Sequence, residues 1–303
     1  MKMKIKTIFT GSSGFLGKVI SNKFYLEELI TIGRNLTTIN CDLSKQIPHL
    51  PDSELIIHAA GKAHMVPKTE QEKQEFFNVN VKGTENLLKG LKQAPSLPKS
   101  FVFISSVAVY GLDSGKNISE EHPLNANDPY GLSKIQAESI VQEWCTKNNV
   151  ICTILRLPLL VGENPPGNLG AMIKGIIKGY YFNIAGGLAK KSMVMAEDVV
   201  QAILPASKIG GIYHLTDGYH PSFKELSFHI ANQLQKKKPK NIPTFIAIFL
   251  GQIGDLLGKK APFSTYKLSK ITSDLTFDDS KARNAFGWSP NKVLAVFEIN
   301  GSL

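Results

Sequence analysis

Two residues whose side chains could exchange a proton lie four positions apart in the segment NDPYGLSKIQAE, residues 127–138. Residues four apart share one face of a helix, so Tyr130 and Lys134 can reach the same site. An ammonium group near a phenol favours the phenolate and lowers the pKa of the tyrosine. The pair therefore predicts a general acid or base. The structural alternative is a half-buried tyrosine beside a solvated lysine.

Three glycines, at positions 11, 14 and 17, lie in the segment FTGSSGFLGKVI, which joins a predicted strand to a predicted helix. In this context Gly11 permits a tight turn, Gly14 lets the backbone approach a pyrophosphate, and Gly17 allows close packing of the helix on the strand. The helix N-terminus then offers N–H groups and positive potential to phosphates. The segment predicts dinucleotide binding, with an ordinary tight turn as the alternative.

The end of the second predicted strand indicates which dinucleotide is bound. An acidic residue at this place hydrogen-bonds the ribose 2′-hydroxyl of NAD, whereas an arginine accommodates the 2′-phosphate of NADP. The chain reads TIGRN there, with Arg34 and no acidic residue. We therefore predict NADP in preference to NAD, with an exposed arginine at a strand end as the alternative.

The elements that must position these residues are short apolar runs that alternate with helical patterns. Runs at 5–10, 29–33, 55–60, 101–106, 150–157 and 212–216 are typical of strands, and helices are predicted at 16–26, 76–92 and 131–148. The runs lack polar alternation, as expected when both faces of a sheet are covered. The pattern predicts an α/β fold with a Rossmann-type doubly wound parallel sheet.

The composition of the chain changes after Leu157. The segment PLLVGENPPGNLG, residues 158–170, is rich in Pro, Gly and Asn, which predicts a loop. We expect a dinucleotide-binding domain made of residues 1–162 and about 193–216. The remaining residues, about 163–192 and 217–303, would form a smaller C-terminal substrate-binding lobe.

Composition excludes several classes of protein. The chain has 303 residues, 43% of them hydrophobic and 20% charged, as in an ordinary globular protein. Its net charge is +10, but the basic residues are scattered and no nucleic-acid motif is present, so we predict no nucleic-acid partner. The three cysteines, at 41, 145 and 152, show no CxxC spacing, which favours a reducing cytoplasmic compartment.

One compact basic run, KKKPK at 236–240, precedes an apolar segment at 242–258. The segment is too short to be a transmembrane helix. A basic run followed by an amphipathic helix can bind a membrane surface, so the region 236–258 is a candidate for weak peripheral membrane contact. The alternative, which we favour from the sequence, is a helix packed on its own domain.

The glycines have the spacing GxxGxxG, and further segments along the chain carry motifs that occur together with this spacing. They are HAAG at 58–61, NVNVKGT at 78–84, SSVAVYG at 105–111, SEEHPLNANDPYGLSK at 119–134, RLPLLVG at 156–162, KSMVMAEDVVQAI at 191–203 and SKARNAFGWSP at 280–290. Over nearly its whole length the sequence resembles the extended short-chain dehydrogenases/reductases, in particular the nucleotide-sugar 4-epimerase and 4-ketoreductase branch.

The resemblance implies roles for individual residues. Tyr130 would exchange a proton with a sugar hydroxyl or ketone, Lys134 would lower the pKa of Tyr130 and hydrogen-bond the nicotinamide ribose, and Ser106 would hold the reacting oxygen. The cofactor-binding positions it implies are Gly11, Ser13, Gly14, Phe15, Leu16, Gly17, Arg34, Asp42, Leu43, Ala59, Ala60, Gly61, Asn80, Ser105, Tyr130, Lys134 and Pro158.

The same resemblance implies a substrate site made of Lys62, His64, Ser106, Asn168 and Lys191. Lys191 stands where many members of the family carry arginine, and lysine lacks the bidentate fork that suits phosphates, which weakens the case for a nucleotide diphosphate. His64 could equally be a structural surface histidine. The pair His58 and His64 lacks metal-ligand spacing, so we predict no metal.

The motifs are compatible with several functions. A 4-epimerase and a 4-ketoreductase acting on a UDP-hexose or UDP-N-acetylhexosamine are both compatible with the motifs. Sugar 4,6-dehydratases carry Asp-Glu after the catalytic Ser or Thr, whereas Val107 and Ala108 follow Ser106, so that route is excluded. A catalytically silent dinucleotide-binding regulatory or scaffold protein is the alternative from another class. Family members often form homodimers through helices that flank the sheet.

Overall fold

A computed structural model describes residues 5–23, 28–63, 65–257 and 264–299 of the chain. Its centre is a seven-stranded sheet in the order β11-β7-β5-β4-β1-β2-β3, and every neighbouring pair is parallel. The strands are β1 (Lys6–Thr10), β2 (Glu28–Gly33), β3 (Ile39–Asn40), β4 (Leu55–His58), β5 (Ser100–Ser106), β7 (Ile151–Leu157) and β11 (Gly211–His214). The predicted Rossmann-type sheet is confirmed.

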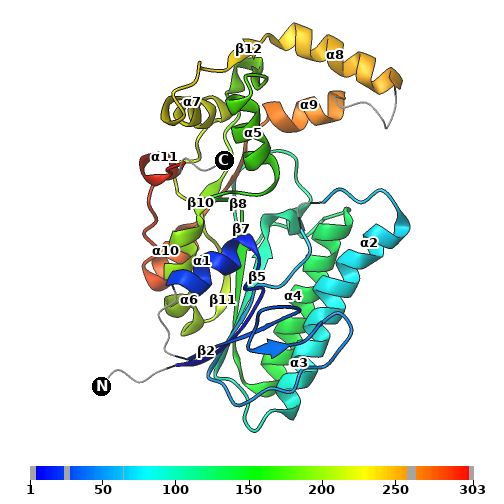
Figure 1. Cartoon of the computed structure of the whole chain (residues 1–303), viewed down its shortest axis with the longest axis vertical. Helices are drawn as coiled ribbons and strands as arrows, with labels where there is room; N and C mark the ends of the chain where they lie inside the picture. The colour runs from blue at the N-terminus through cyan, green and yellow to red at the C-terminus, as the bar shows by residue number, and fades with distance from the viewer. Residues whose placement is uncertain (1–4, 24–27, 64, 258–263, 300–303) are drawn as a thin grey trace.

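Helices cover both faces of this sheet (Figure 1). One face carries α1 (Phe15–Lys23), α6 (Ala196–Ser207) and α10 (Ser280–Phe286), and the other carries α3 (Gly83–Gln93) and α4 (Pro129–Asn148). Adjacent strand residues point to opposite cores: Phe9 joins the first, while Ile8 joins the second. Both faces are therefore apolar, which explains why the strand sequences lack alternation.

The helix predicted at 76–92 is longer and less regular in the structure. It begins as α2 (Glu70–Phe77), where the Thr69 hydroxyl accepts a hydrogen bond from the Glu72 amide at 3.1 Å. A π-helical turn, η1 (Asn78–Lys82), then leads into α3. Such wide turns often mark functional positions in helices, and this one contains Asn80.

The segment predicted as a loop at 158–170 contains regular structure. Strand β8 (Leu159–Val161) pairs in parallel with β10 (Met193–Met195), and α5 (Gly167–Ile177) begins within the segment. The pairing with a distant strand supplies backbone hydrogen bonds that no local pattern announces. The loop prediction was therefore wrong for residues 159–161 and 167–170.

The other elements gather beyond the carboxyl ends of the central strands, at the upper end of Figure 1. They are β9 (Phe182–Ile184), η3 (Ala185–Gly187), α7 (Phe223–Gln233), β12 (Lys240–Ile242), α8 (Thr244–Leu257), α9 (Thr265–Thr272) and α11 (Val293–Val296). Strands β6 (Gly115–Ile118) and β13 (Leu275–Phe277) pair beside the short helix η2 (Val107–Tyr110). Among the described helices, none is long and apolar enough to cross a bilayer. The division into two domains stays a prediction.

Candidate active site

The turn after β1 is built around close backbone contacts. Gly11 has φ +88°, and a Cβ there would lie 2.6 Å from the carbonyl carbon of Ala59. A Cβ at Gly17 would lie 1.9 Å from the Gly11 carbonyl oxygen. Only glycine fits these two positions, so β1, β4 and the start of α1 can approach closely, as the motif predicts.

A cleft of about 600 Å³ opens beside this turn. Its lining includes ten residues predicted from the sequence, namely Gly11, Ser13, Gly14, Arg34, Asp42, Leu43, Ala59, Ala60, Gly61 and Lys62. Residues of α2 and η1, among them Gln71, Glu75 and Asn78, also line the cleft and were not predicted. The volume lies in the usual range of ligand sites, and the glycine turn and helix N-terminus suit a dinucleotide pyrophosphate.

The rim of the cleft carries a basic side chain, Arg34, near an acidic one, Asp42. Arg34 is exposed at the end of β2. The hydroxyl of Ser44 donates to Asp42 at 2.6 Å, and this hydrogen bond, with a smaller contribution from the charge of Arg34, lowers the pKa of Asp42. The side-chain amide of Asn86 donates to the Leu43 carbonyl at 2.8 Å and holds the same loop in place.

Asn80 connects the cleft to α4. Its Oδ1 accepts a hydrogen bond from the Lys62 amide at 2.7 Å, and its Nδ2 donates to the Ser133 hydroxyl at 2.8 Å. Ser133 in turn donates to the carbonyl of Tyr130 at 2.7 Å. The π-helical turn thus fixes the loop after β4 against the first turn of α4. Ser133 was missed by sequence reasoning, although it lies inside the YGLSK segment.

The position of Tyr130 follows from the way α4 begins. Asp128 caps the helix by accepting from the amides of Tyr130 and Gly131 at 3.0 and 3.1 Å, and Pro129 occupies the first turn. Burial raises the pKa of Tyr130, and a hydrogen bond with Ser106, at the end of β5, opposes that effect. The two side chains that were predicted to share one substrate oxygen are therefore adjacent.

Lys134 is fully enclosed in the protein one turn further along α4. Its Nζ donates to the Ile104 carbonyl at 2.8 Å and lies 4.6 Å from the centre of the Phe103 ring. Burial lowers the pKa of Lys134 to about 8, while the charge of Glu138 acts in the opposite direction. The hydrogen bond with Ser106 acts to lower the pKa of Tyr130, and the effect of Lys134 on that pKa stays a prediction.

Gly61 brings the cleft and the Tyr130 region together. It lines the cleft, and a Cβ at this position would lie 3.3 Å from Lys134 Nζ. On the other side, the ring of Phe76 lies 6.2 Å from the ring of Tyr130 and 5.8 Å from Lys62 Nζ. Lys62 also forms an ion pair with Glu75. Lys134 therefore lies directly behind Gly61 at one end of the cleft, while Ser106, Tyr130 and Lys134 are not themselves among the residues that line it.

Two polar groups beneath the site were not predicted as parts of it. His58 lies between the hydroxyls of Thr10 and Thr84, at 2.6 and 2.9 Å, and burial lowers its pKa to about 3. On α4, Glu138 accepts hydrogen bonds from Ser105 and from Arg156, the latter at 2.7 Å. The hydroxyl of Ser105, a predicted cofactor contact, is thus committed to Glu138.

The predicted substrate residues are more dispersed. Asn168 is exposed in the first turn of α5. Lys191 is half-buried, its Nζ donates to the carbonyl of Lys270 in α9 at 3.0 Å, and burial lowers its pKa. Pro158 follows β7, and Phe15 and Leu16 open α1. His64 lies outside the described residues. In the part of the chain that is described, no cluster of His, Cys, Asp and Glu suits a metal ion.

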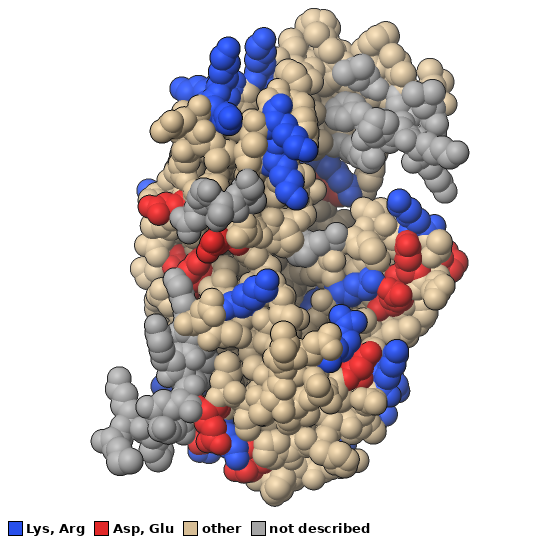
Figure 2. All heavy atoms as spheres, in the orientation of Figure 1, with Lys and Arg blue, Asp and Glu red and all other residues tan. Residues whose placement is uncertain are grey.

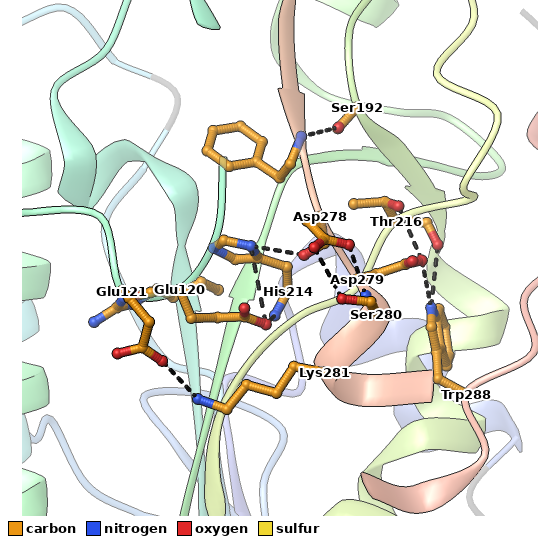
Figure 3. Close-up of polar contacts among 12 residues, drawn as sticks. Glu120, Glu121, Ser192, His214, Thr216, Asp278, Asp279, Ser280, Lys281 and Trp288 are labelled. Atoms are coloured by element: carbon orange, nitrogen blue, oxygen red, sulfur yellow. Dashed lines mark hydrogen bonds and ion pairs between the residues drawn. The ribbon is translucent and has the colours of Figure 1, made fainter. Parts of the chain in front are cut away.

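A second polar network ties the edge of the sheet to the segment after β13 (Figure 3). The amide of His214 donates to Glu120 at 2.8 Å, and its Nδ1 lies 3.0 Å from the Asp278 carbonyl. Its Nε2 lies 2.6 Å from the Tyr110 hydroxyl, and burial lowers the pKa of His214 to about 4. At the surface end of this network, Lys281 forms an ion pair with Glu121 at 3.1 Å. The network holds α10 against β11.

Known proteins resemble this chain in sequence and in fold. It is 31% identical over 221 residues to N-acetyl-alpha-D-glucosaminyl-diphospho-ditrans,octacis-undecaprenol 4-epimerase from Escherichia coli O157:H7. The matched region covers 69% of this chain and 66% of that protein. It is 25% identical over 320 residues to UDP-glucose 4-epimerase from Vibrio cholerae, covering 97% and 93%.

A solved structure shares the fold. UDP-glucuronic acid 4-epimerase from Bacillus cereus, in complex with UDP-glucuronic acid and NAD, superposes with a TM-score of 0.72 at 18% identity and covers 97% of this chain and 96% of that one. The sequence pattern of one family matches residues 7–211, which contain the glycine turn, the cleft and α4. The chain therefore belongs to the NAD-dependent epimerase/dehydratase family.

Proposed function

We propose that this protein transfers hydride at C4 of a diphosphate-linked hexose, as a 4-epimerase or a 4-ketoreductase that uses a nicotinamide dinucleotide. One observation supports the proposal: Tyr130 and Ser106 are adjacent, and Lys134, one helical turn from Tyr130, lies directly behind Gly61 in the lining of the cleft. The names of the relatives supply the substrate class. By that analogy the first candidate substrate is a UDP-hexose or UDP-N-acetylhexosamine.

The proton chemistry would belong to Tyr130. Because burial raises its pKa, the phenol is protonated at neutral pH and is suited to donate to a C4 ketone as the alcohol forms. Ser106 would hold the same oxygen through its hydroxyl. Lys134, whose pKa lies at about 8, keeps a positive charge near the site without a carboxylate contact of its own among the described residues.

The glycine turn would hold the pyrophosphate of the dinucleotide, and the rim would hold its adenosine half. When bound, the nicotinamide supplies or accepts the hydride. Arg34 is exposed at the rim, which supports a contact with a 2′-phosphate. This favours NADP over NAD. NADP in turn favours the reductase, because a reductase consumes NADPH and releases the oxidised cofactor in every turnover.

A second candidate substrate is a hexose linked through diphosphate to a polyprenol. The name of the Escherichia coli relative, at 31% identity, supports it. Either substrate agrees with a role in the supply of sugars for surface polysaccharides in the cytoplasm.

The test is a turnover assay with purified protein. UDP-sugars, polyprenyl-diphosphate sugars and their 4-keto forms are each incubated with NADPH or NADH, and the products are identified by mass spectrometry and NMR. Stoichiometric loss of NADPH with a 4-keto sugar supports the reductase, and interconversion of C4 epimers without net loss of cofactor supports the epimerase. Dinucleotide binding without any turnover would contradict the proposal in favour of a regulatory or scaffold protein.

A variant of the proposed acid sharpens this assay. Tyr130→Phe removes the phenolic hydroxyl but keeps the ring against Phe76, so turnover should fall by about 10²–10⁴-fold while the dinucleotide Kd changes by less than about threefold. Tyr219→Phe, which removes an exposed hydroxyl bonded to Glu225, is the matched control and should keep full activity. Full activity of Tyr130→Phe would remove Tyr130 from the mechanism.

We also propose that the protein forms a homodimer through α3 and α4. A shallow groove of about 220 Å³ lies on these two helices, lined by Leu88, Ile140 and Trp144 and bordered by charged side chains. Sedimentation velocity of the wild type and of Ile140→Asp tests this assembly, because a charge in the groove should shift a dimer towards the monomer. The same sedimentation coefficient for both proteins would contradict the assembly through this face.

A further inference from the structure

Helix α8 carries its large apolar side chains on the outside. Phe245, Phe249 and Leu256 are 72%, 61% and 88% exposed, whereas Ala247 is 1% exposed and Gly251 is buried. Positions 245, 249 and 256 share one face of a helix, and positions 247 and 251 share the opposite face. The helix thus packs through its smallest residues and presents its largest ones, the reverse of an ordinary surface helix.

The inward side of α8 is fully engaged. A Cβ at Gly251 would lie 3.2 Å from the amide nitrogen of Thr265, at the start of α9. Asp255, the one charged residue of α8, accepts hydrogen bonds from the amide and the hydroxyl of Thr265, the latter at 2.6 Å. The orientation of α8 is therefore fixed by α9, and its apolar face has no such partner among the described residues.

A group of basic side chains lies directly before α8. Lys236, Lys237, Lys238 and Lys240 are all exposed, and in the described part of the chain none of them forms an ion pair. Figure 2 shows basic side chains gathered at the upper end of the molecule, over α7 and β12, with the acidic ones lower on this face. Strand β12 leads into α8, so the basic group and the apolar face are neighbours.

Further apolar side chains extend this surface. Strand β12 pairs with β9, which places Lys240 beside the exposed Phe182. Leu188, at the end of η3, is also exposed, and η3 contacts both α8 and β12. A surface of large apolar side chains bordered by unpaired lysines suits the boundary between the headgroups and the acyl chains of an anionic bilayer.

We propose that α8 and Lys236–Lys240 form a membrane-docking surface, on which the apolar face of α8 inserts among acyl chains and the lysines bind anionic phospholipid headgroups. The helix is too short to span a bilayer, so it would lie in the plane of the membrane. This inference goes beyond the proposed reaction and does not depend on it. It would bring the protein to the surface where a polyprenol-linked substrate resides.

A second copy of the chain fits this surface less well. In a two-fold dimer the same patch would face itself, which would bring the two groups of unpaired lysines together. The one acidic side chain among the described residues of the patch, Asp255, is bonded to Thr265 and forms no ion pair with these lysines, so it does not offset their repulsion. An anionic lipid surface complements the lysines and the apolar face at once.

Vesicle binding of the full-length protein tests the proposal. We expect co-sedimentation with unilamellar vesicles of phosphatidylcholine that contain about 30% phosphatidylglycerol, and much less with phosphatidylcholine alone. Lys236→Gln/Lys237→Gln/Lys238→Gln should lower the partition coefficient by about 100-fold, because each lysine contributes about fivefold. Phe245→Ser/Phe249→Ser/Leu256→Ser should lower it by at least as much.

Matched controls separate docking from general charge and from misfolding. Lys18→Gln/Lys99→Gln/Lys208→Gln removes the same charge from exposed positions elsewhere and should change the partition coefficient by less than about threefold. Circular dichroism should give the serine variant a Tm close to that of the wild type. Wild-type protein that ignores both vesicles, or a control that loses as much binding as the test variants, would overturn the proposal. So would a dimer, seen by sedimentation without lipid, that the serine variant abolishes.

Discussion

Helices α4 and α8 are built in opposite ways. In α4 the charged side chains Lys134 and Glu138 are buried, and each has a defined hydrogen-bond partner inside the protein. In α8 the interior side carries Ala247 and Gly251, and the phenylalanines face outward. Each helix thus departs from the usual rule of apolar residues inside and charged residues outside.

The two helices differ in how their unusual side chains relate to folding. Buried charges are tolerated in α4 because the surrounding hydrogen bonds compensate for lost hydration, which fixes the side chains in one arrangement. The apolar surface of α8 is exposed in the folded chain and in the unfolded chain alike, so it has little effect on the free energy of unfolding. In the folded protein it is available to a partner. Substitutions should therefore affect folding strongly in α4 and weakly in α8.

The largest effect on stability is expected for Glu138→Ala. Removal of this carboxylate leaves the guanidinium of Arg156 buried without its partner, which should lower the free energy of unfolding by about 3–5 kcal/mol. Glu143→Ala, on the same helix, breaks an exposed pair with Lys147 and should cost less than about 0.5 kcal/mol. Urea unfolding measures both, and equal losses would contradict the contrast within α4.

The buried histidines should make the protein less stable in acid. The pKa of His58 is lowered to about 3 and that of His214 to about 4, so the unfolded chain binds more protons than the native one below pH 6.5. The contribution of these histidines to the free energy of unfolding is complete above pH 6.5. It is lost as the pH falls towards 4, by about 1.4 kcal/mol per pH unit for each histidine.

Urea unfolding between pH 7 and pH 5 measures this slope. His58→Asn should make it shallower, because one of the two titrating groups is gone. His49→Asn, at an exposed position, is the control and should leave the slope of the wild type unchanged. An identical slope for His58→Asn and the wild type would show that His58 does not titrate as its burial implies.

A smaller effect is expected at the rim of the cleft, where Arg34 is exposed to solvent. Arg34→Ala should raise the Kd of NADPH by about tenfold and that of NADH by less than about twofold, since only NADPH carries the 2′-phosphate. Isothermal titration calorimetry measures both values. Lys45→Ala, at the same rim, serves as the control for loss of charge alone. Equal losses for the two dinucleotides would remove the argument for NADP.

The smallest effect is expected on α8. Phe249→Ser removes a side chain that is mostly exposed, so the free energy of unfolding should change by less than about 0.5 kcal/mol. Ala247→Ser, at a buried position, is the contrasting variant and should cost more. If Phe249→Ser lowers stability by more than Ala247→Ser, the outward face of α8 is not free in the isolated protein.

The sequence was sufficient to predict the sheet, the glycine turn and the identity of the family. Those features depend on local patterns: apolar runs, turn residues and the spacing of glycines that only a tight βα turn requires. Burial of both sheet faces is also visible as a lack of alternation in the runs around Ile8 and Ile56. The helix after the basic run was predicted too, and α8 packs on α9 through its small residues.

The contacts that complete the site were not predictable, because they join segments far apart in the chain. The hydrogen bonds of His58 with Thr84, of Lys191 with Lys270 and of His214 with Glu120 depend on which loops meet at the ends of the strands. The hydrogen bond of the Lys134 ammonium with the carbonyl of Ile104, on β5, was missed for the same reason.

The fit of Gly11 against Ala59 has a consequence for the order of assembly. The loop after β1 reaches its shape only when β4 lies alongside, since the Ala60 amide donates to the Thr10 hydroxyl at 3.1 Å and the Ala59 amide to the Thr10 carbonyl. A nascent chain that ends before β4 therefore has the glycines but no cradle for phosphate. Affinity for dinucleotide should emerge late during synthesis, after the parallel pairing of distant strands, and its appearance would time that event.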